Sequence, residues 1–456
     1  MSTPFPAAPG GIAIVGGGLA GCECALYLAR HGLDVALYEQ KPAQRSPAHV
    51  SDQLAELVCS NSLRSNELTS GIGLLKQEMR ELGSAFMAVA DACRVPAGKA
   101  LAVDREQFAA RLTGAVLAHP GISLHREQVS DPDALAACVV LAAGPLMAEG
   151  LAHWLQGAMG GGGLYFYDAI APIVSAESLD MSIVFRGSRY QEPGEADSGD
   201  YLNCPFNREE YLAFWRALLE AEKVAPRDFE RERHFEGCMP IEALAERGER
   251  TLTFGPLKPV GFTDPRTGHR PWAIVQLRAE NRNASAFNLV GCQTKLTHAA
   301  QDAVFRRIPG LERAEFVRYG SMHRNTYVNA PRVLDAGLRL RARPHVRLAG
   351  QITGVEGYVE SAASGLWLAL LLVAEARGLT LPPPPLTTAL GGLLGHLYND
   401  VKHFQPSNAH FGLLPELGEA ARKKERKALY SQRARADFAA WLASLPDGLI
   451  LPPLPV

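Results

Sequence analysis

Two cysteines stand in sequence contexts that suit a reactive thiol. Cys59 lies in LVCSNSLRSNE, where serine and asparagine side chains and Arg64 surround it. Cys238 lies in FEGCMPIE, between Gly237 and Pro240, in a predicted turn that would expose its sulfur. A neighbouring cation and hydrogen-bond donors favour the thiolate, the nucleophilic form of cysteine. Both residues are therefore candidates for covalent catalysis, and packing of a small apolar side chain is the alternative interpretation of each.

The remaining cysteines are interpreted as packing residues. The chain has eight cysteines without a CxxC pair or a zinc-type spacing, so we expect reduced thiols, a cytoplasmic location and no metal. The longest strongly apolar run, 366–374, is far shorter than the ~20 residues that a membrane span needs, so no membrane is expected. The packing cysteines are Cys22, Cys24, Cys93, Cys138, Cys204 and Cys292.

A glycine-rich loop near the N-terminus predicts nucleotide binding. Gly16-x-Gly18-x-x-Gly21 follows the apolar run 12–15 and opens a predicted helix. In such a loop the first glycine permits a tight turn, the second lets the backbone approach a pyrophosphate, and the third lets helix and strand pack closely. Glu39 follows 18 residues after Gly21, where an acid would bind ribose hydroxyls. The predicted contacts here are Gly16, Gly17, Gly18, Leu19, Ala20, Gly21 and Glu39.

NAD and FAD would both fit this loop, and two later segments favour FAD. LAAG at 141–144 and LAGQ at 348–351 are strand ends that lead into turns, as in flavoproteins with two dinucleotide-type domains. The second segment places Gly350 and Gln351 where an isoalloxazine ring or ribityl chain could lie. Gln351 is atypical, because many flavoproteins carry an acid there. Tyr358 is predicted to stack on the flavin or on a pterin, with a core tyrosine as the alternative.

The elements around these residues predict an α/β fold, with a Rossmann-type FAD-binding domain interrupted by a smaller α+β insertion domain. The predicted elements are strands 12–15, 35–38, 137–144 and 346–350 and helices 20–30 and 359–377. Alternating segments at 252–254 and 273–277 predict strands within the insertion. The predicted boundaries are 11–150 for the first part of the FAD-binding domain, 151–325 for the insertion, and 326–456 for the second part with C-terminal helices.

Charge does not indicate a generally basic nucleic-acid-binding chain, because the net charge is −2. Any RNA contact must therefore come from local clusters of basic residues, for which a solvated face is the default interpretation. One cluster on a predicted C-terminal helix comprises Arg422, Lys423, Lys424, Arg426, Lys427, Arg433 and Arg435. A second cluster in the insertion comprises Arg266, His269, Arg270, Arg278 and Arg282.

Longer segments are more specific than the glycine loop. Examples are GGGLAGCECALYLA (16–29), AELVCSNSLRSNE (55–67), GLLKQEM (73–79), ALAVDREQF (100–108), FEGCMPIE (235–242), VRYGSMHRNTYVNAP (317–331) and AGQITGVEGYVES (349–361). In these segments the chain resembles the TrmFO family of folate- and FAD-dependent tRNA uracil-5-methyltransferases. The resemblance runs from about residue 11 to about residue 440. One departure is GCQTKL at 291–296, where the family usually has phenylalanine in place of Cys292.

The resemblance implies a reaction and its participants. The family methylates uracil C5 at position 54, in the T loop of tRNA, with 5,10-methylenetetrahydrofolate as donor, FAD as bound cofactor and NAD(P)H as reductant. Its two catalytic cysteines fall on Cys59 and Cys238. We expect Cys238 to attack C6 and Cys59 to act as a base or to assist, with the exchanged assignment as the alternative. No obligate protein partner is implied.

Three other functions are compatible with a flavin fold. A tRNA-modifying flavoprotein acting on wobble uridines (GidA-like) shares the fold and the use of folate, but normally has a longer chain with a C-terminal helical extension. A small-molecule flavin reductase or hydroxylase would need neither an RNA surface nor two exposed thiols. A non-catalytic FAD-binding RNA scaffold would be insensitive to loss of both cysteines. The sequence does not distinguish NADH from NADPH.

Overall fold

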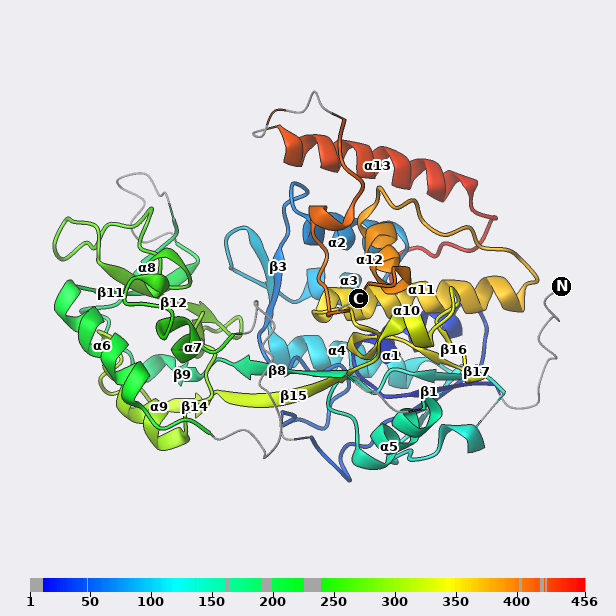
Figure 1. The fold of residues 1–456 in the computed structure, drawn as a ribbon, viewed down its shortest axis with the longest axis horizontal. Helices are drawn as coiled ribbons and strands as arrows, with labels where there is room; N and C mark the ends of the chain where they lie inside the picture. Colours follow the sequence, from blue (N-terminus) through cyan, green and yellow to red (C-terminus); the bar gives the residue numbers. More distant parts are fainter. Residues whose placement is uncertain are drawn as a thin grey trace.

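The protein has two bodies, one on either side of a long strand pair (Figure 1). The computed structural model describes residues 11–46, 48–135, 137–160, 164–189, 199–224, 239–401, 404–418, 422 and 425–455. Three predicted functional residues, Cys238, Lys423 and Lys424, lie outside the described residues. The body at the right of Figure 1 holds a mostly parallel sheet between helices, and the body at the left holds an antiparallel sheet.

The mostly parallel sheet confirms the predicted α/β class. Its strand order is β16-β17-β7-β1-β2-β6, and all neighbours are parallel except the edge pair β16–β17. Its strands are β1 (Ile12–Val15), β2 (Val35–Tyr38), β6 (Ile122–His125), β7 (Val139–Leu141), β16 (Arg339–Leu340) and β17 (Arg343–Leu348). Strand β17 lies beside β7 although the antiparallel body separates them in sequence. This arrangement supports the proposed division into 11–150, 151–325 and 326–456.

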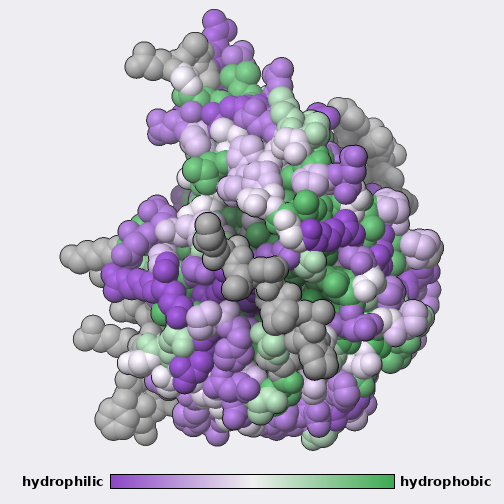
Figure 2. Space-filling model, turned by 90° about the vertical axis from the view of Figure 1, so that its right-hand side faces the viewer, coloured by the Kyte–Doolittle hydropathy of each residue, from purple (hydrophilic) through white to green (hydrophobic). Residues whose placement is uncertain are grey.

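Two buried helices form the core next to this sheet. In α1 (Leu19–Arg30) every residue up to Ala29 is buried, and α1 packs against α11 (Tyr358–Ala376). Their backbones approach closely, because a Cβ on Gly365 would lie 2.3 Å from the carbonyl oxygen of Ala20. By length and mean hydropathy (1.5), α11 could span a membrane, but 83% of that stretch is buried inside the protein. We therefore interpret α11 as a core helix. Hydrophilic residues cover much of the molecular face shown in Figure 2.

The antiparallel sheet has the order β10-β11-β12-β13-β9-β14 and its own apolar core. Its strands are β9 (Ile173–Ser175), β10 (Phe185–Gly187), β11 (Tyr201–Phe206), β12 (Ala273–Ala279), β13 (Ala286–Val290) and β14 (Phe316–Arg318). The nearby helices are α6 (Arg208–Glu220), α7 (Ile241–Ala245), α8 (Thr251–Phe254) and α9 (His298–Phe305). The predicted strand at 273–277 is correct, but the one at 252–254 is wrong, because this segment forms the short helix α8 and ends at Gly255.

Smaller elements join the two bodies and surround the Cys59 segment. The long pair of β8 (Leu164–Ile170) and β15 (Ser321–Tyr327) runs between the bodies (Figure 1). A three-stranded sheet contains β3 (Ser62–Ser65), β5 (Ala100–Val103) and β4 (Arg94–Val95). The remaining helices are α2 (Gly71–Glu81), α3 (Ala85–Ala92), α4 (Arg105–Ala118), α5 (Glu149–Ala158), α10 (Ala330–Val333), α12 (Ala389–Tyr398) and α13 (Arg426–Ser444).

Candidate active site

The glycines of the first loop have three different structural roles. Gly16 has φ +111°, and a Cβ there would lie 2.4 Å from the carbonyl oxygen of Ala142. A Cβ on Gly21 would lie 1.9 Å from the carbonyl oxygen of Gly16, so the third glycine allows α1 to pack on the loop. A Cβ on Gly18 would meet nothing within 4 Å. Gly18 is also the N-cap of α1 and provides no side-chain cap, so the helix start is open to an anion.

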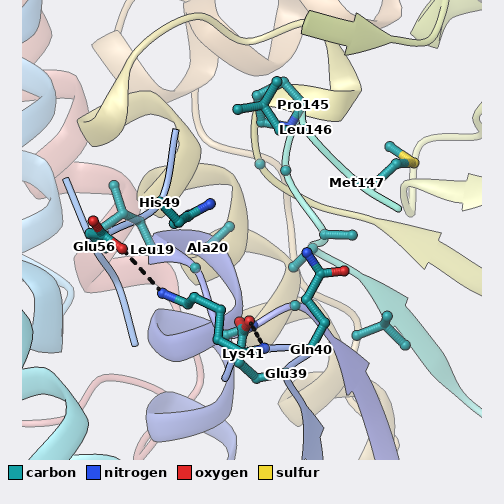
Figure 3. Close-up of a pocket in the computed structure, with 18 of the residues that line it drawn as sticks. Leu19, Ala20, Glu39, Gln40, Lys41, His49, Glu56, Pro145, Leu146 and Met147 are labelled. Atoms are coloured by element: carbon teal, nitrogen blue, oxygen red, sulfur yellow. Dashed lines mark hydrogen bonds and ion pairs between the residues drawn. The ribbon is translucent and has the colours of Figure 1, made fainter. Parts of the chain in front are cut away.

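Glu39 is held at the end of β2 by two backbone donors. The N–H of Gly17 donates to Oε2 of Glu39 at 2.9 Å, and the N–H of Lys41 donates to Oε1 at 2.9 Å. The Lys41 ammonium in turn pairs with Glu56 at 3.5 Å. Figure 3 shows these side chains on one side of a cavity, with Pro145, Leu146 and Met147 across from them. The carboxylate is therefore fixed where it can accept hydrogen bonds from ribose hydroxyls.

Nine of the ten predicted cofactor contacts line this first cavity, and the exception, Gly21, lies behind it in the packed loop. The lining contacts are Gly16, Gly17, Gly18, Leu19, Ala20, Glu39, Gly350, Gln351 and Tyr358. The open space at Gly18, the uncapped helix start and the fixed acid fit a dinucleotide. Gln351, the atypical residue, donates from Nε2 to Oε2 of Glu356 at 2.6 Å, so an acid stands close to the position where many flavoproteins have one.

A second cavity of about 320 Å³ adjoins the first and contains Cys59. That volume falls in the usual range for small-molecule sites. The two cavities share Val58, Pro145, Leu146, Gln351 and Tyr358 in their walls. The second cavity is also lined by amide side chains, among them Gln293 and the almost fully buried Asn325. A ligand in the first cavity can therefore approach a molecule held beside Cys59.

Tyr358 positions the backbone of the Cys59 segment. Its Oη accepts hydrogen bonds from the N–H groups of Cys59 at 2.6 Å and Ser60 at 3.3 Å. Burial, and then the nearby Cys59, raise the pKa of Tyr358 above its ordinary value. The phenol therefore keeps its proton near neutral pH and has an O–H to donate into the site. The sequence predicts that Tyr358 stacks on a ring, whereas its hydrogen bonds in the structure hold the Cys59 segment.

Arg278 holds the same segment from the insertion. Its Nη2 donates to Oγ of Ser60 at 2.7 Å and its Nε donates to Oδ1 of Asn61 at 2.8 Å. Asn61 also donates to the carbonyl oxygens of Val103 and Ala279. Arg278 is 6% exposed, so its earlier assignment to a surface RNA-binding cluster is wrong. It lines the second cavity instead.

Two more arginines make the surroundings of Cys59 cationic. Arg105 pairs with Glu280 at 2.8 Å and also donates to the carbonyl oxygen of Leu57. Although burial opposes its charge, the carboxylate of Glu280 raises the pKa of Arg105. Arg318 donates to the carbonyl oxygen of Ala48 at 2.9 Å, and burial and then Arg105 lower its pKa. Cationic surroundings of this kind favour the nucleophilic form of a thiol.

Lys76 supports the strand that follows Cys59. It is fully buried on α2, and its ammonium donates to the carbonyl oxygens of Leu63, Arg64 and Ser65 at 2.7, 3.1 and 2.6 Å. Burial, reinforced by nearby arginines, lowers the pKa of Lys76 to about 7. The only sequence signal for this role was a lysine within the otherwise largely apolar GLLKQEM segment.

Within the described residues no group of three His, Cys, Asp or Glu side chains could hold a metal ion.

The Arg278→Met variant is expected to lower kcat about tenfold to a hundredfold with little change in flavin content. Methionine keeps much of the packing but removes the bonds to Ser60 and Asn61, and a small misplacement of a reacting group can cost about a hundredfold. Steady-state kinetics with separate kcat and KM values would measure this. Arg282→Met is the control, because Arg282 is exposed and lies four residues after Arg278, and this variant is expected to keep the wild-type kcat. An unchanged kcat in Arg278→Met would remove its positioning role.

The Rossmann sheet, the glycine loop at a helix start and the fixed acid define a dinucleotide-binding protein of the α/β class. A family model described as glucose inhibited division protein A matches residues 11–380. The solved structure of Aquifex aeolicus GidA superposes with a TM-score of 0.65 at 16% identity, covering 96% of this chain and 74% of that chain. At this identity the likeness supports the fold alone.

Curated relatives narrow the class further. The chain is 67% identical over 446 residues to methylenetetrahydrofolate--tRNA-(uracil-5-)-methyltransferase TrmFO of Nitratidesulfovibrio vulgaris, covering 97% of this chain and 94% of the relative. It is 55% identical over 437 residues to the protein of the same name from Geobacter sulfurreducens, covering 96% and 100%. The chain therefore belongs to the TrmFO family, as its sequence segments indicated.

Proposed function

We propose that this protein methylates C5 of a uracil in tRNA, with 5,10-methylenetetrahydrofolate as one-carbon donor and FAD as cofactor. Family membership supports the reaction. The structural observation that carries it is the position of Cys59, in a cavity that shares Gln351 and Tyr358 with the dinucleotide cavity. The finer parts of the proposal are uridine 54 of the T loop as target, NAD(P)H as reductant and the cytoplasm as location. No protein partner is required by this scheme.

The proposed cofactor contacts follow from the geometry of the first cavity. The start of α1 and Gly18 would hold the pyrophosphate, and Glu39 would hold the ribose hydroxyls. Gln351 and Tyr358, which line both cavities, would stand beside the isoalloxazine ring. When bound, FAD supplies the redox and one-carbon-transfer chemistry that amino-acid side chains lack.

The two cysteines would activate the base. C5 of uracil is a poor nucleophile, and addition of a thiolate at C6 makes an enolate whose C5 can attack an electrophilic carbon. After C5 has gained the carbon, a base must remove the C5 proton so that the thiolate can leave C6. We assign the attack on C6 to Cys238 and the base or an assisting role to Cys59. The cationic arginines around Cys59 suit a group that must carry negative charge.

Asn325 is proposed to contact the base. Its side chain is 3% exposed and lines the second cavity from β15. A primary amide carries both donors and an acceptor, which match the imide edge of uracil. Gln293 lines the same cavity and offers the same groups. Buried amides make a site selective, because an analogue without the matching groups leaves them unpaired.

Mass spectrometry of an unmodified tRNA transcript tests the function. The transcript is incubated with the purified protein, methylenetetrahydrofolate and NADPH, alongside a control that lacks the folate. We expect one added methyl group on a single T-loop uridine, only when folate is present. No methyl gain with flavin-loaded protein would contradict the proposal. It would redirect attention to wobble-uridine chemistry or to a small-molecule reductase.

A further inference from the structure

A groove in the insertion has no assigned role in the reaction. It occupies about 1050 Å³ between the end of β11, the start of α6, the helix α8 and the loop that leads to Trp272. None of its lining residues lines either of the two cavities described above. In Figure 1, α6 and α8 lie at the left of the molecule, whereas β1, whose end carries the glycine loop, lies at the right. We call this the insertion groove.

The insertion groove is strongly cationic. Its lining includes five lysine or arginine side chains, against two carboxylates, Glu210 and Asp264. Both carboxylates are already engaged by the protein, because Asp264 pairs with Arg266 at 2.9 Å and Glu210 accepts from the N–H of Asn207 at 2.8 Å. The cationic side chains are Arg208, Arg250, Lys258, Arg266 and Arg270, and all are exposed. The groove therefore suits an anionic ligand.

Aromatic rings alternate with guanidinium groups along the insertion groove. The guanidinium of Arg208 lies 5.5 Å from the ring centre of Trp272. That of Arg250 lies 5.9 Å from Trp272 and 5.2 Å from Phe254. Phe254 is 70% exposed, which leaves a large aromatic surface in water beside the cations. Proteins that bind single-stranded nucleic acids combine cations with accessible aromatic rings. The cations bind the phosphates, and the bases stack on the rings.

We propose that the insertion groove binds a part of the tRNA substrate remote from the loop that carries the target uracil. Phosphates would contact Lys258 and Arg270, and an unstacked base would lie on Phe254. An acidic protein would use the cations but would gain little from an exposed ring flanked by arginines, so the groove favours RNA. This proposal rests on the proposed function, because it assumes that tRNA is the substrate.

Equilibrium binding of two labelled RNAs tests the insertion groove. Fluorescence anisotropy would compare a full-length tRNA transcript with the isolated T-arm hairpin. For full-length tRNA, Phe254→Ala and the double variant Lys258→Gln/Arg270→Gln are each expected to weaken binding about tenfold. The double variant is also expected to reduce the salt dependence, the slope of log K against log[salt], by about 1.5, because it loses two phosphate contacts. Binding of the hairpin and kcat at saturating tRNA are expected to stay unchanged.

A matched control carries the same charge change elsewhere. Arg111→Gln/Arg341→Gln removes two exposed arginines from the FAD-binding body and is expected to bind both RNAs like the wild type. Unchanged tRNA affinity in the groove variants, or equal losses for tRNA and hairpin, would overturn the proposal. So would a wild-type protein that binds no RNA. If tRNA binds through the groove but gains no methyl group, only the proposed function fails.

Discussion

The Cys238→Ala variant is expected to lose covalent capture of tRNA that contains 5-fluorouracil, whereas Cys59→Ala is expected to retain capture and to lose turnover. Fluorine replaces the C5 proton, so the base has no proton to remove and the thiolate cannot leave C6. With methylenetetrahydrofolate and NADPH present, the adduct therefore accumulates once C5 has gained the carbon, provided that the attacking thiol is present. Denaturing gel electrophoresis of labelled tRNA would measure the captured fraction.

Turnover separates the two roles further. A positioned acid–base group contributes about a hundredfold to ten-thousandfold, so Cys59→Ala is expected to lower kcat on natural tRNA by that range. Cys292→Ala is the control, because Cys292 is fully buried and lines neither cavity. If Cys59→Ala loses capture and Cys238→Ala retains it, the roles are exchanged. If both single variants capture normally, neither cysteine is the attacking group.

The cofactor loop could be predicted from the sequence because its requirements are local. A strand, three spaced glycines, a helix and an acid at the end of the next strand lie within 28 residues, from Ile12 to Glu39. Each glycine has a steric reason that depends on its immediate neighbours. The pairing of β7 with the distant strand β17 supports the proposed two-part division, and both strands could be predicted because buried strands are visible as apolar runs wherever they stand in the chain.

The surroundings of Cys59 could not be predicted in the same way. Arg278 and Tyr358 reach it from more than 200 residues away, so only the assembled fold brings them together. Arg278 was expected at the surface because arginine is rarely buried unless it is paired. In β12, however, both faces are covered, and Arg278 points to Ser60 and Asn61.

The strand predicted at 252–254 was wrong because the segment is short. Leu252–Phe254 is three residues long, and alternation over so few positions cannot separate a strand from one turn of helix. Leu252 is buried and Phe254 is 70% exposed, a pattern that both structures produce. The outcome matters for function, because α8 presents Phe254 to the insertion groove.

The Gly18→Val variant is expected to fold and to lose most of its bound flavin. Gly18 has φ −78° and ψ −167°, which valine adopts without strain, and a Cβ there meets no protein atom within 4 Å. The fold should therefore tolerate the side chain, at a cost of about 1 kcal/mol or less for the poorer N-cap. The added methyl groups would occupy the space at the start of α1 that the pyrophosphate needs. Flavin absorbance per mole of purified protein would measure the loss, which is expected to exceed about tenfold at equal FAD supply.

Two further glycine variants separate loss of the ligand from loss of the fold. Gly114→Val adds the same side chain at an open position of α4 that lines neither cavity, and is expected to keep its flavin. Gly16→Val is expected to unfold the loop, because its φ of +111° disfavours a side chain and its Cβ would lie 2.4 Å from a carbonyl oxygen. Gly18→Val should then match Gly114→Val in the unfolding temperature measured without FAD, and match Gly16→Val in flavin content. Full flavin content in Gly18→Val would show that the pyrophosphate does not approach the backbone there.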